Sequence, residues 1–138
     1  MLDTTTEAGA RADRRLRGEI MMWLTTVRSD GQPQSVPVWF LWDGETFLIY
    51  SQRGRQKLKN IGRNARVGLH LNSNERGSDV VRVEGAAELL EDFAPANEVG
   101  EYLEKYRESI ARIGFDPDGF ARAYPIALRV TPDRWRVW

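Results

Sequence analysis

The chain has 138 residues and a mass of 15.8 kDa, which is enough for one domain with its own core but too little for two. An apolar fraction of 41% and five Trp exclude a disordered chain, because such chains lack aromatic and branched side chains. Twenty basic and twenty acidic side chains cancel, so any attraction to an anion must be local. With no Cys and one His, the sequence offers no thiolate nucleophile, disulfide or Cys- or His-built metal site.

Residues 1–18 are polar and charged, and we expect them to form a helix or a disordered arm that contributes little to the core. Residues 19–138 then form the folded domain. Because no apolar run is long enough for a membrane span or a signal segment, the sequence predicts a cytoplasmic protein without a membrane span.

Strand-like segments begin after this N-terminal region. Residues 21–28, 34–42 and 47–51 are rich in branched and aromatic side chains. They are separated by Asp30-Gly31 and Asp43-Gly44, and Asp-Gly is typical of hairpin turns. This pattern predicts a three-stranded antiparallel meander.

The rest of the chain alternates between the two periodicities of helices and strands. In chain order we expect a short helix over 54–63, strands over 65–72 and 80–89, a long helix over 95–113, a short helix started by Asp116-Pro117, and two closing strands around a turn at 131–133. Six or seven antiparallel strands with one main helix and short peripheral helices indicate an α+β, barrel-like fold.

The distribution of charge is uneven although the net charge is zero. No acidic residue occurs between Glu45 and Glu75, and this segment contains Arg53, Arg55, Lys57, Lys59, Arg63 and Arg66. Gly54 lies where a strand gives way to the short helix, so free backbone N–H groups and the positive end of the helix dipole are expected there. From the residues alone, this segment is either a phosphate or carboxylate site or a solvated basic helix.

Aromatic side chains are concentrated in the first three predicted strands. Trp23, Trp39, Phe40, Trp42, Phe47 and Tyr50 are more than the interior of a small barrel is expected to hold. Two interpretations remain open for each of them: it binds a planar ligand whose phosphate lies near Gly54, or it packs in the core and at a dimer contact.

The sequence contains no recognisable pair of nucleophile and base. It has no Cys and no Gly-x-Ser-x-Gly turn, and His70 lies on the polar face of a predicted strand. We therefore assign no catalytic side chain. If the protein is an enzyme, a bound cofactor must supply the chemistry, and hydride transfer fits such a site.

Three sequence segments resemble a known family. They are Asp30-Gly31-Gln32-Pro33, Val36-Pro37-Val38-Trp39-Phe40, and the run from Tyr50 to Ile61, in which Arg55, Lys57 and Asn60 form an Arg-x-Lys-x-x-Asn element. They resemble the pyridoxamine-5'-phosphate-oxidase-like, FMN-binding split β-barrel, and within it the actinobacterial branch of reductases that use the deazaflavin coenzyme F420. Only three of the twenty basic residues are Lys, which agrees with an actinobacterial source.

The resemblance implies a homodimer with cofactor sites between the protomers. By position, it implies phosphate contacts from Ser51, Arg53, Arg55, Lys57 and Asn60. It also implies that the cofactor ring lies along Val36, Pro37, Val38 and Trp39, and that Trp135 comes from the opposite protomer. The C-terminal Arg134-Trp135-Arg136-Val137-Trp138 does not reproduce the substrate-phosphate segment of true pyridoxamine-phosphate oxidases, which disfavours vitamin B6 oxidation.

The expected activity is F420-dependent hydride transfer to a small, planar, apolar acceptor. Cations beyond the phosphate site, such as Arg53, Lys59 and Arg63, favour F420 with its polyglutamate tail over FMN. The alternatives are an FMN-binding oxidoreductase of the same fold and a non-catalytic carrier of F420 or flavin. A nucleic-acid-binding barrel is a further alternative, and zero net charge argues against it.

Overall fold

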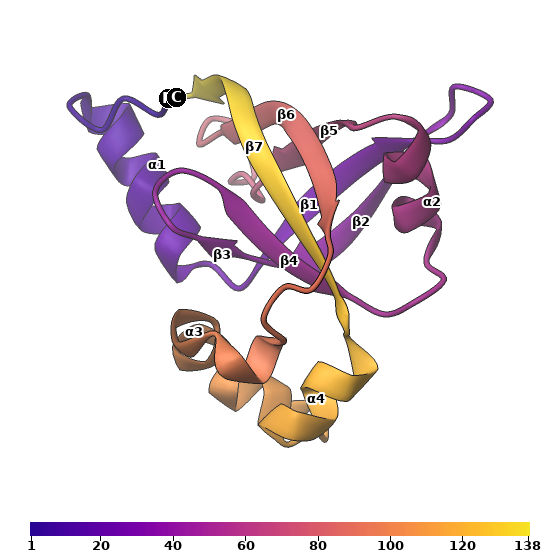
Figure 1. Ribbon diagram of the computed structural model, residues 1–138. Helices are drawn as coiled ribbons and strands as arrows, with labels where there is room; N and C mark the ends of the chain where they lie inside the picture. Colours follow the sequence, from indigo (N-terminus) through magenta and orange to yellow (C-terminus); the bar gives the residue numbers. More distant parts are fainter.

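A computed structural model describes residues 1–138, and its seven strands form one antiparallel sheet that curls into a barrel (Figure 1). In chain order the elements are α1 (Glu7–Gly18), β1 (Met21–Val27), β2 (Pro33–Trp39), β3 (Leu41–Trp42), β4 (Phe47–Ser51), α2 (Gln56–Arg63), β5 (Arg66–His70), β6 (Val81–Leu90), α3 (Gly100–Arg112), α4 (Pro117–Ala123) and β7 (Ile126–Val137), with a 3₁₀ turn at Ala96–Glu98. The sheet order is β2-β1-β5-β6-β7-β4-β3. The predicted α+β split-barrel class is confirmed. None of the helices is long and apolar enough to cross a membrane.

The predicted meander is wrong, although both Asp-Gly turns are confirmed. β1 pairs with β2 and β3 pairs with β4, but β2 and β3 lie at opposite edges of the sheet. The chain leaves the first hairpin at Phe40, whose backbone N–H donates to the Tyr106 hydroxyl at 2.7 Å instead of to a strand. The single strand expected over 34–42 is therefore divided into β2 and β3, which form the two edge strands of the sheet.

The predicted turn at 131–133 is also wrong, because β7 is continuous over twelve residues. Its pairing with β6 is irregular between Glu84 and Gly85, so Asp133, which has no partner residue on β6, forms a bulge next to Pro132. Gly85 is required there, since a Cβ atom on it would lie 2.4 Å from the Thr131 carbonyl oxygen.

The barrel interior is filled by apolar side chains from the strands and from α1. Leu2, Ala12 and Leu16 are buried in this cluster, so the expectation that residues 1–18 contribute little to the core is wrong. Asp13 on α1 also accepts a hydrogen bond of 2.9 Å from the Trp42 indole.

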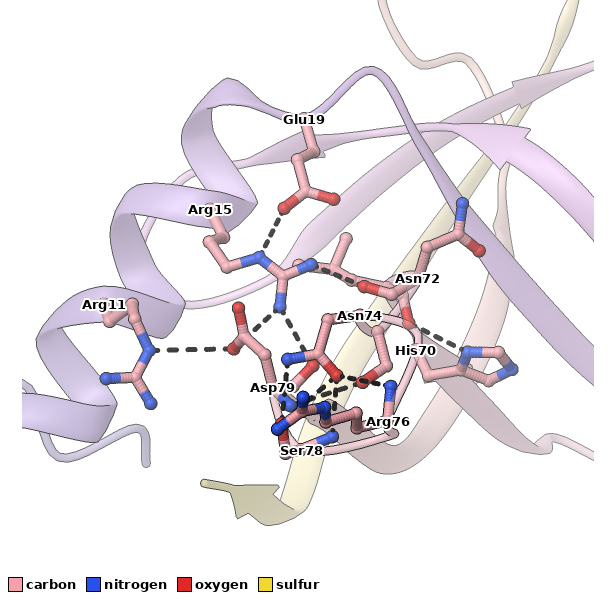
Figure 2. Close-up of polar contacts among 11 residues, drawn as sticks. Arg11, Arg15, Glu19, His70, Asn72, Asn74, Arg76, Ser78 and Asp79 are labelled. Carbon is pink, nitrogen blue, oxygen red and sulfur yellow. Dashed lines mark hydrogen bonds and ion pairs between the residues drawn. The ribbon is translucent and has the colours of Figure 1, made fainter.

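Polar contacts fasten α1 to the loop between β5 and β6 (Figure 2). Arg15 donates to the backbone carbonyls of Asn72 and Asp79, and it forms ion pairs with Glu19 and the Asp79 carboxylate. Because the guanidinium is largely shielded from solvent, these bonds fix the helix more firmly than an exposed ion pair would.

A second cluster of apolar side chains joins the outer side of the sheet to α3 and α4. Figure 1 shows these two helices together on one side of the barrel. The long helix predicted over 95–113 begins at Gly100, and Ile113 is exposed rather than buried. The predicted start of the short helix is confirmed, because the Asp116 side chain accepts from the Gly119 N–H at 2.7 Å. These helices cover the outer face of β4 and the first half of β7, including Leu48, Tyr50 and Ala127.

Candidate functional site

A cavity of about 300 Å³ opens between the edge strand β2, the end of β4, the start of α2 and the helices α3 and α4. This volume is at the lower end of the range of small-molecule sites. The lining residues are Pro37, Val38, Trp39, Tyr50, Ser51, Gln52, Arg55, Lys57, Tyr102, Ile113, Phe120 and Tyr124.

One side of the cavity is cationic. Arg55 is the N-cap residue of α2 and Lys57 lies in its first turn, and no side chain caps this helix start. Neither residue forms an ion pair, and the one hydrogen bond of the Arg55 guanidinium goes to the Gln52 amide oxygen. Burial, and secondarily the charge of Arg55, lower the pKa of the Lys57 ammonium. An anion bound here would offset both effects and meet the positive end of the helix dipole.

The other side of the cavity is built from stacked rings. The Trp39 ring lies between Tyr106 and Phe120, with centroid separations of 4.8 and 5.5 Å and interplanar angles of 9° and 21°. Tyr124 extends the column, because its ring stacks on Phe120 at 4.5 Å. Offset stacks of this kind add stabilisation beyond area burial. The column runs from the buried Tyr106 to the half-buried Tyr124, and three of its rings, Trp39, Phe120 and Tyr124, line the cavity with apolar surface.

Three tyrosines pack in and beside this wall. The Tyr50 hydroxyl donates to the Ala94 carbonyl at 2.7 Å, and burial raises the pKa of Tyr50 to about 12. Burial also raises the pKa of Tyr102 and Tyr106, so all three hydroxyls stay protonated near neutral pH. The wall is therefore uncharged, and only the α2 side carries charge.

The fold brings together six of the predicted cofactor residues at this cavity: Pro37, Val38, Trp39, Ser51, Arg55 and Lys57. Val36 is exposed on β2 and Arg53 is exposed on the loop before α2, and neither lines the cavity. These two residues flank the site without contributing to its walls.

Asn60 and Trp135 do not reach the cavity. Both amide hydrogens of the buried Asn60 are occupied, because it donates to Thr26 and Gln34 at 2.9 and 3.0 Å, and so the side chain anchors α2 to the barrel. The Trp135 ring packs against Trp42 and Phe47 of its own barrel. The indole is partly buried there, and a contribution of Trp135 to the site of an opposite protomer stays a prediction.

The residues that sequence reasoning missed come mostly from the late helices. Tyr102, Ile113, Phe120 and Tyr124 line the cavity, as does Gln52 before α2. The predicted helix periodicity could have placed Tyr102 and Tyr106 on one apolar face, but nothing in the sequence indicates that this face closes on the end of β4. That this face closes on the end of β4 is seen only from the way α3 and α4 dock in the structure.

The sequence profile of the pyridoxamine 5'-phosphate oxidase family matches residues 9–138. The chain belongs to this family. The match includes the strands, α2 and the late helices that together form the cavity. No curated protein sequence matches the chain.

Solved structures agree with this family membership. A protein named F420 reductase is 26% identical, with a TM-score of 0.68 over 90% of this chain and 94% of that one. A conserved hypothetical protein from Mycobacterium tuberculosis is also 26% identical, with a TM-score of 0.74 over 96% of this chain and 84% of that one. HutZ, a heme storage protein from Vibrio cholerae, is 14% identical with a TM-score of 0.67, covering 96% and 95% of the two chains. This last likeness extends to the fold alone.

Proposed function

We propose that this family member binds coenzyme F420 and is an oxidoreductase that uses the reduced cofactor. The observation that carries the proposal is the pair of unpaired cations at the start of α2, Arg55 and Lys57, facing stacked aromatic rings across one cavity. A ligand with a phosphate and a planar ring matches both sides at once. The likeness to the solved F420 reductase supports the same choice.

The side chains that line the cavity match the chemical groups of such a cofactor. Arg55 and Lys57 would hold the phosphate, and Pro37 to Trp39 would flank the ring. The Ser51 hydroxyl would join the phosphate by turning away from the Gln52 carbonyl, to which it donates at 2.9 Å. Arg53, Lys59 and Arg63 are exposed on and beside α2 without acidic partners, where they favour a ligand with further negative charge. The bound deazaflavin would supply a hydride to a small, planar, apolar acceptor.

No titratable side chain of the cavity is assigned to move a proton, and the proton that completes reduction of the acceptor after hydride transfer would come from solvent. Lys57 serves as a charge for the phosphate, and the tyrosines stay protonated, so the protein's contribution is to bind the ring, orient it and exclude water. The aromatic wall performs the last task because it covers the inner side of the cavity with apolar surface.

We also propose that the chain forms a homodimer through the part of the sheet that no helix covers. On this outer face of β1, β2 and β5, Trp23 stacks beside the exposed His70 at 6.5 Å, next to the small side chains of Thr25 and Ser35. The exposed Val36 and Pro37 lie at the border between this face and the cavity. Sedimentation should therefore give twice the mass of the chain, and a monomer would exclude a site shared between protomers.

Equilibrium binding tests the cofactor assignment. Purified apo-protein is titrated with F420 and, separately, with FMN, and the fluorescence of each ligand is followed. We expect saturable F420 binding at or below the order of tens of micromolar. If F420 causes no change at this concentration while FMN binds tightly, the protein is a flavin-binding member instead.

Turnover separates an enzyme from a carrier of the same cofactor. Reduced F420 is mixed with the protein and a panel of planar, apolar acceptors, and oxidation of the cofactor is followed at steady state. We expect at least one acceptor to be reduced faster with protein than without it. Binding without turnover across the panel would identify a carrier.

A further inference from the structure

One of the three tyrosines behind the cavity differs from the other two. Tyr50, Tyr102 and Tyr106 pack together, with ring centroids 5.0 Å apart for Tyr50 and Tyr102 and 4.8 Å apart for Tyr102 and Tyr106. Tyr50 donates to the Ala94 carbonyl, and the Tyr106 hydroxyl accepts from Phe40 and donates to the Ile20 carbonyl at 2.6 Å. The Tyr102 hydroxyl is fully buried and has no hydrogen-bond partner.

An unpartnered buried hydroxyl is costly, because it has lost its bonds to water without replacing them. Phe at this position would fill the same volume without that cost. A Tyr here therefore needs a partner that the chain alone does not supply.

The place of Tyr102 indicates what that partner is. Two other buried polar atoms lack a partner, the Trp135 indole nitrogen and the Asn97 amide oxygen, and neither residue lines this cavity. Tyr102 does line it, together with Arg55 and Lys57 on the cationic side and Trp39 and Phe120 in the column. The unpartnered hydroxyl is thus carried by a residue of the cavity wall, between the cationic side and the ring side; because it has less than 1 Å² of exposed surface, a ligand reaches it when a neighbouring ring turns aside.

We propose that Tyr102 is a specificity-determining residue of this cavity, whose hydroxyl donates a hydrogen bond to an acceptor atom on the edge of the bound planar ring. The proposal rests on the proposed function, in which the ring is that of a phosphate-bearing cofactor. Deazaflavin and flavin rings both carry carbonyl oxygens at one edge, whereas a plain aromatic hydrocarbon carries none. The Tyr102 hydroxyl therefore favours ligands whose ring carries an acceptor atom at its edge, and the cations of α2 favour ligands that carry a phosphate.

The test is Tyr102→Phe, which removes only the hydroxyl. We expect the variant to bind F420, or FMN if that is the ligand, about tenfold more weakly, which is the loss of one buried hydrogen bond. Its unfolding midpoint in urea should stay the same or rise, because the free protein loses no bond. Weaker binding without loss of stability is a result that a purely structural role would not give.

The neighbouring tyrosines supply matched controls. Tyr106→Phe and Tyr50→Phe also remove one hydroxyl each, but from groups that are partnered within the chain. Both should lower the urea midpoint, in contrast to Tyr102→Phe. If Tyr102→Phe lowers the midpoint as they do, the hydroxyl has a partner within the protein and the proposal is overturned.

A second ligand separates this inference from the proposed function. 1-Naphthyl phosphate has a phosphate and a planar ring but no acceptor atom on the ring edge, so wild type and Tyr102→Phe should bind it equally. If wild type binds neither F420 nor FMN, the proposed function fails. If wild type binds either cofactor and Tyr102→Phe binds it with unchanged affinity, only the role of Tyr102 fails, and the hydroxyl serves at most an ordered water.

Discussion

The barrel interior and the helical layer are both rich in aromatic rings, but they are built differently. The interior encloses Phe40, Trp42 and Phe47 among aliphatic side chains from the strands and α1. The helical layer stacks its rings on one outer face of the sheet and leaves a cavity where it meets α2. Under the proposed function, stability and ligand binding lie in separate regions, so that substitutions in each should have separable effects.

The largest effect is expected from emptying the interior. Phe47 is fully buried, so Phe47→Ala should lower the free energy of unfolding by about 3–5 kcal/mol, as loss of a core aromatic ring typically does. Urea denaturation measures this change. Phe115→Ala, at the half-buried edge of the helical layer, is the control and should cost clearly less. Equal losses at the two sites would remove the distinction between the regions.

The next largest effect concerns the cationic side of the cavity. Arg55→Ala and Lys57→Ala should each weaken cofactor binding by about 1–3 kcal/mol, the range for a charge-assisted hydrogen bond, with little change in stability. Arg66→Ala is the control, since Arg66 is exposed and paired with Asp133 away from the cavity. Titration of the three variants should leave Arg66→Ala at wild-type affinity. Unchanged binding in both cavity variants would place the phosphate elsewhere.

A smaller effect is expected at the outer end of the ring column. Tyr124→Leu removes a ring that stacks on Phe120 beside the cavity, and should weaken cofactor binding by about 0.5–1.5 kcal/mol. Tyr124→Phe keeps the ring and should bind as wild type does. Isothermal titration of both variants compares them directly. If the Phe variant loses as much as the Leu variant, the hydroxyl matters there rather than the stack.

The smallest effect concerns Lys105, which joins the two regions. Its ammonium donates to the Phe40 carbonyl at 2.8 Å and lies over the Phe40 ring, and burial lowers its pKa from 10.5 to about 8. Between these values the unfolded chain binds more protons at this site than the folded one, so this group makes stability rise with pH from about 8 upward. Urea midpoints across this range should rise less in Lys105→Met than in wild type. An identical pH profile would show that Lys105 is not buried as described.

Local patterns predicted most of the strands, both Asp-Gly turns and the Asp116 cap, because alternation, turn dipeptides and caps act over a few residues. The break at Phe40 could not be predicted in this way, since the Phe40 backbone N–H bonds to a tyrosine 66 residues further along the chain. The cationic half of the site was predictable because residues 51–57 form one continuous segment. The aromatic half depends on how α3 and α4 dock, and the buried, fully bonded Asn60 shows that a motif position does not by itself place a side chain in the cavity.

The most direct test of the central claim is to identify the small molecule that the protein retains. The protein is purified from a host that makes both F420 and FMN, and the bound fraction is analysed by absorbance and mass spectrometry. We expect the retained molecule to be F420, and we expect it to be lost from the Arg55→Ala, Lys57→Ala double variant but kept by Arg66→Ala. Retention of F420 by the double variant would contradict the assignment of the phosphate to α2, and retention of FMN alone would contradict the choice of deazaflavin.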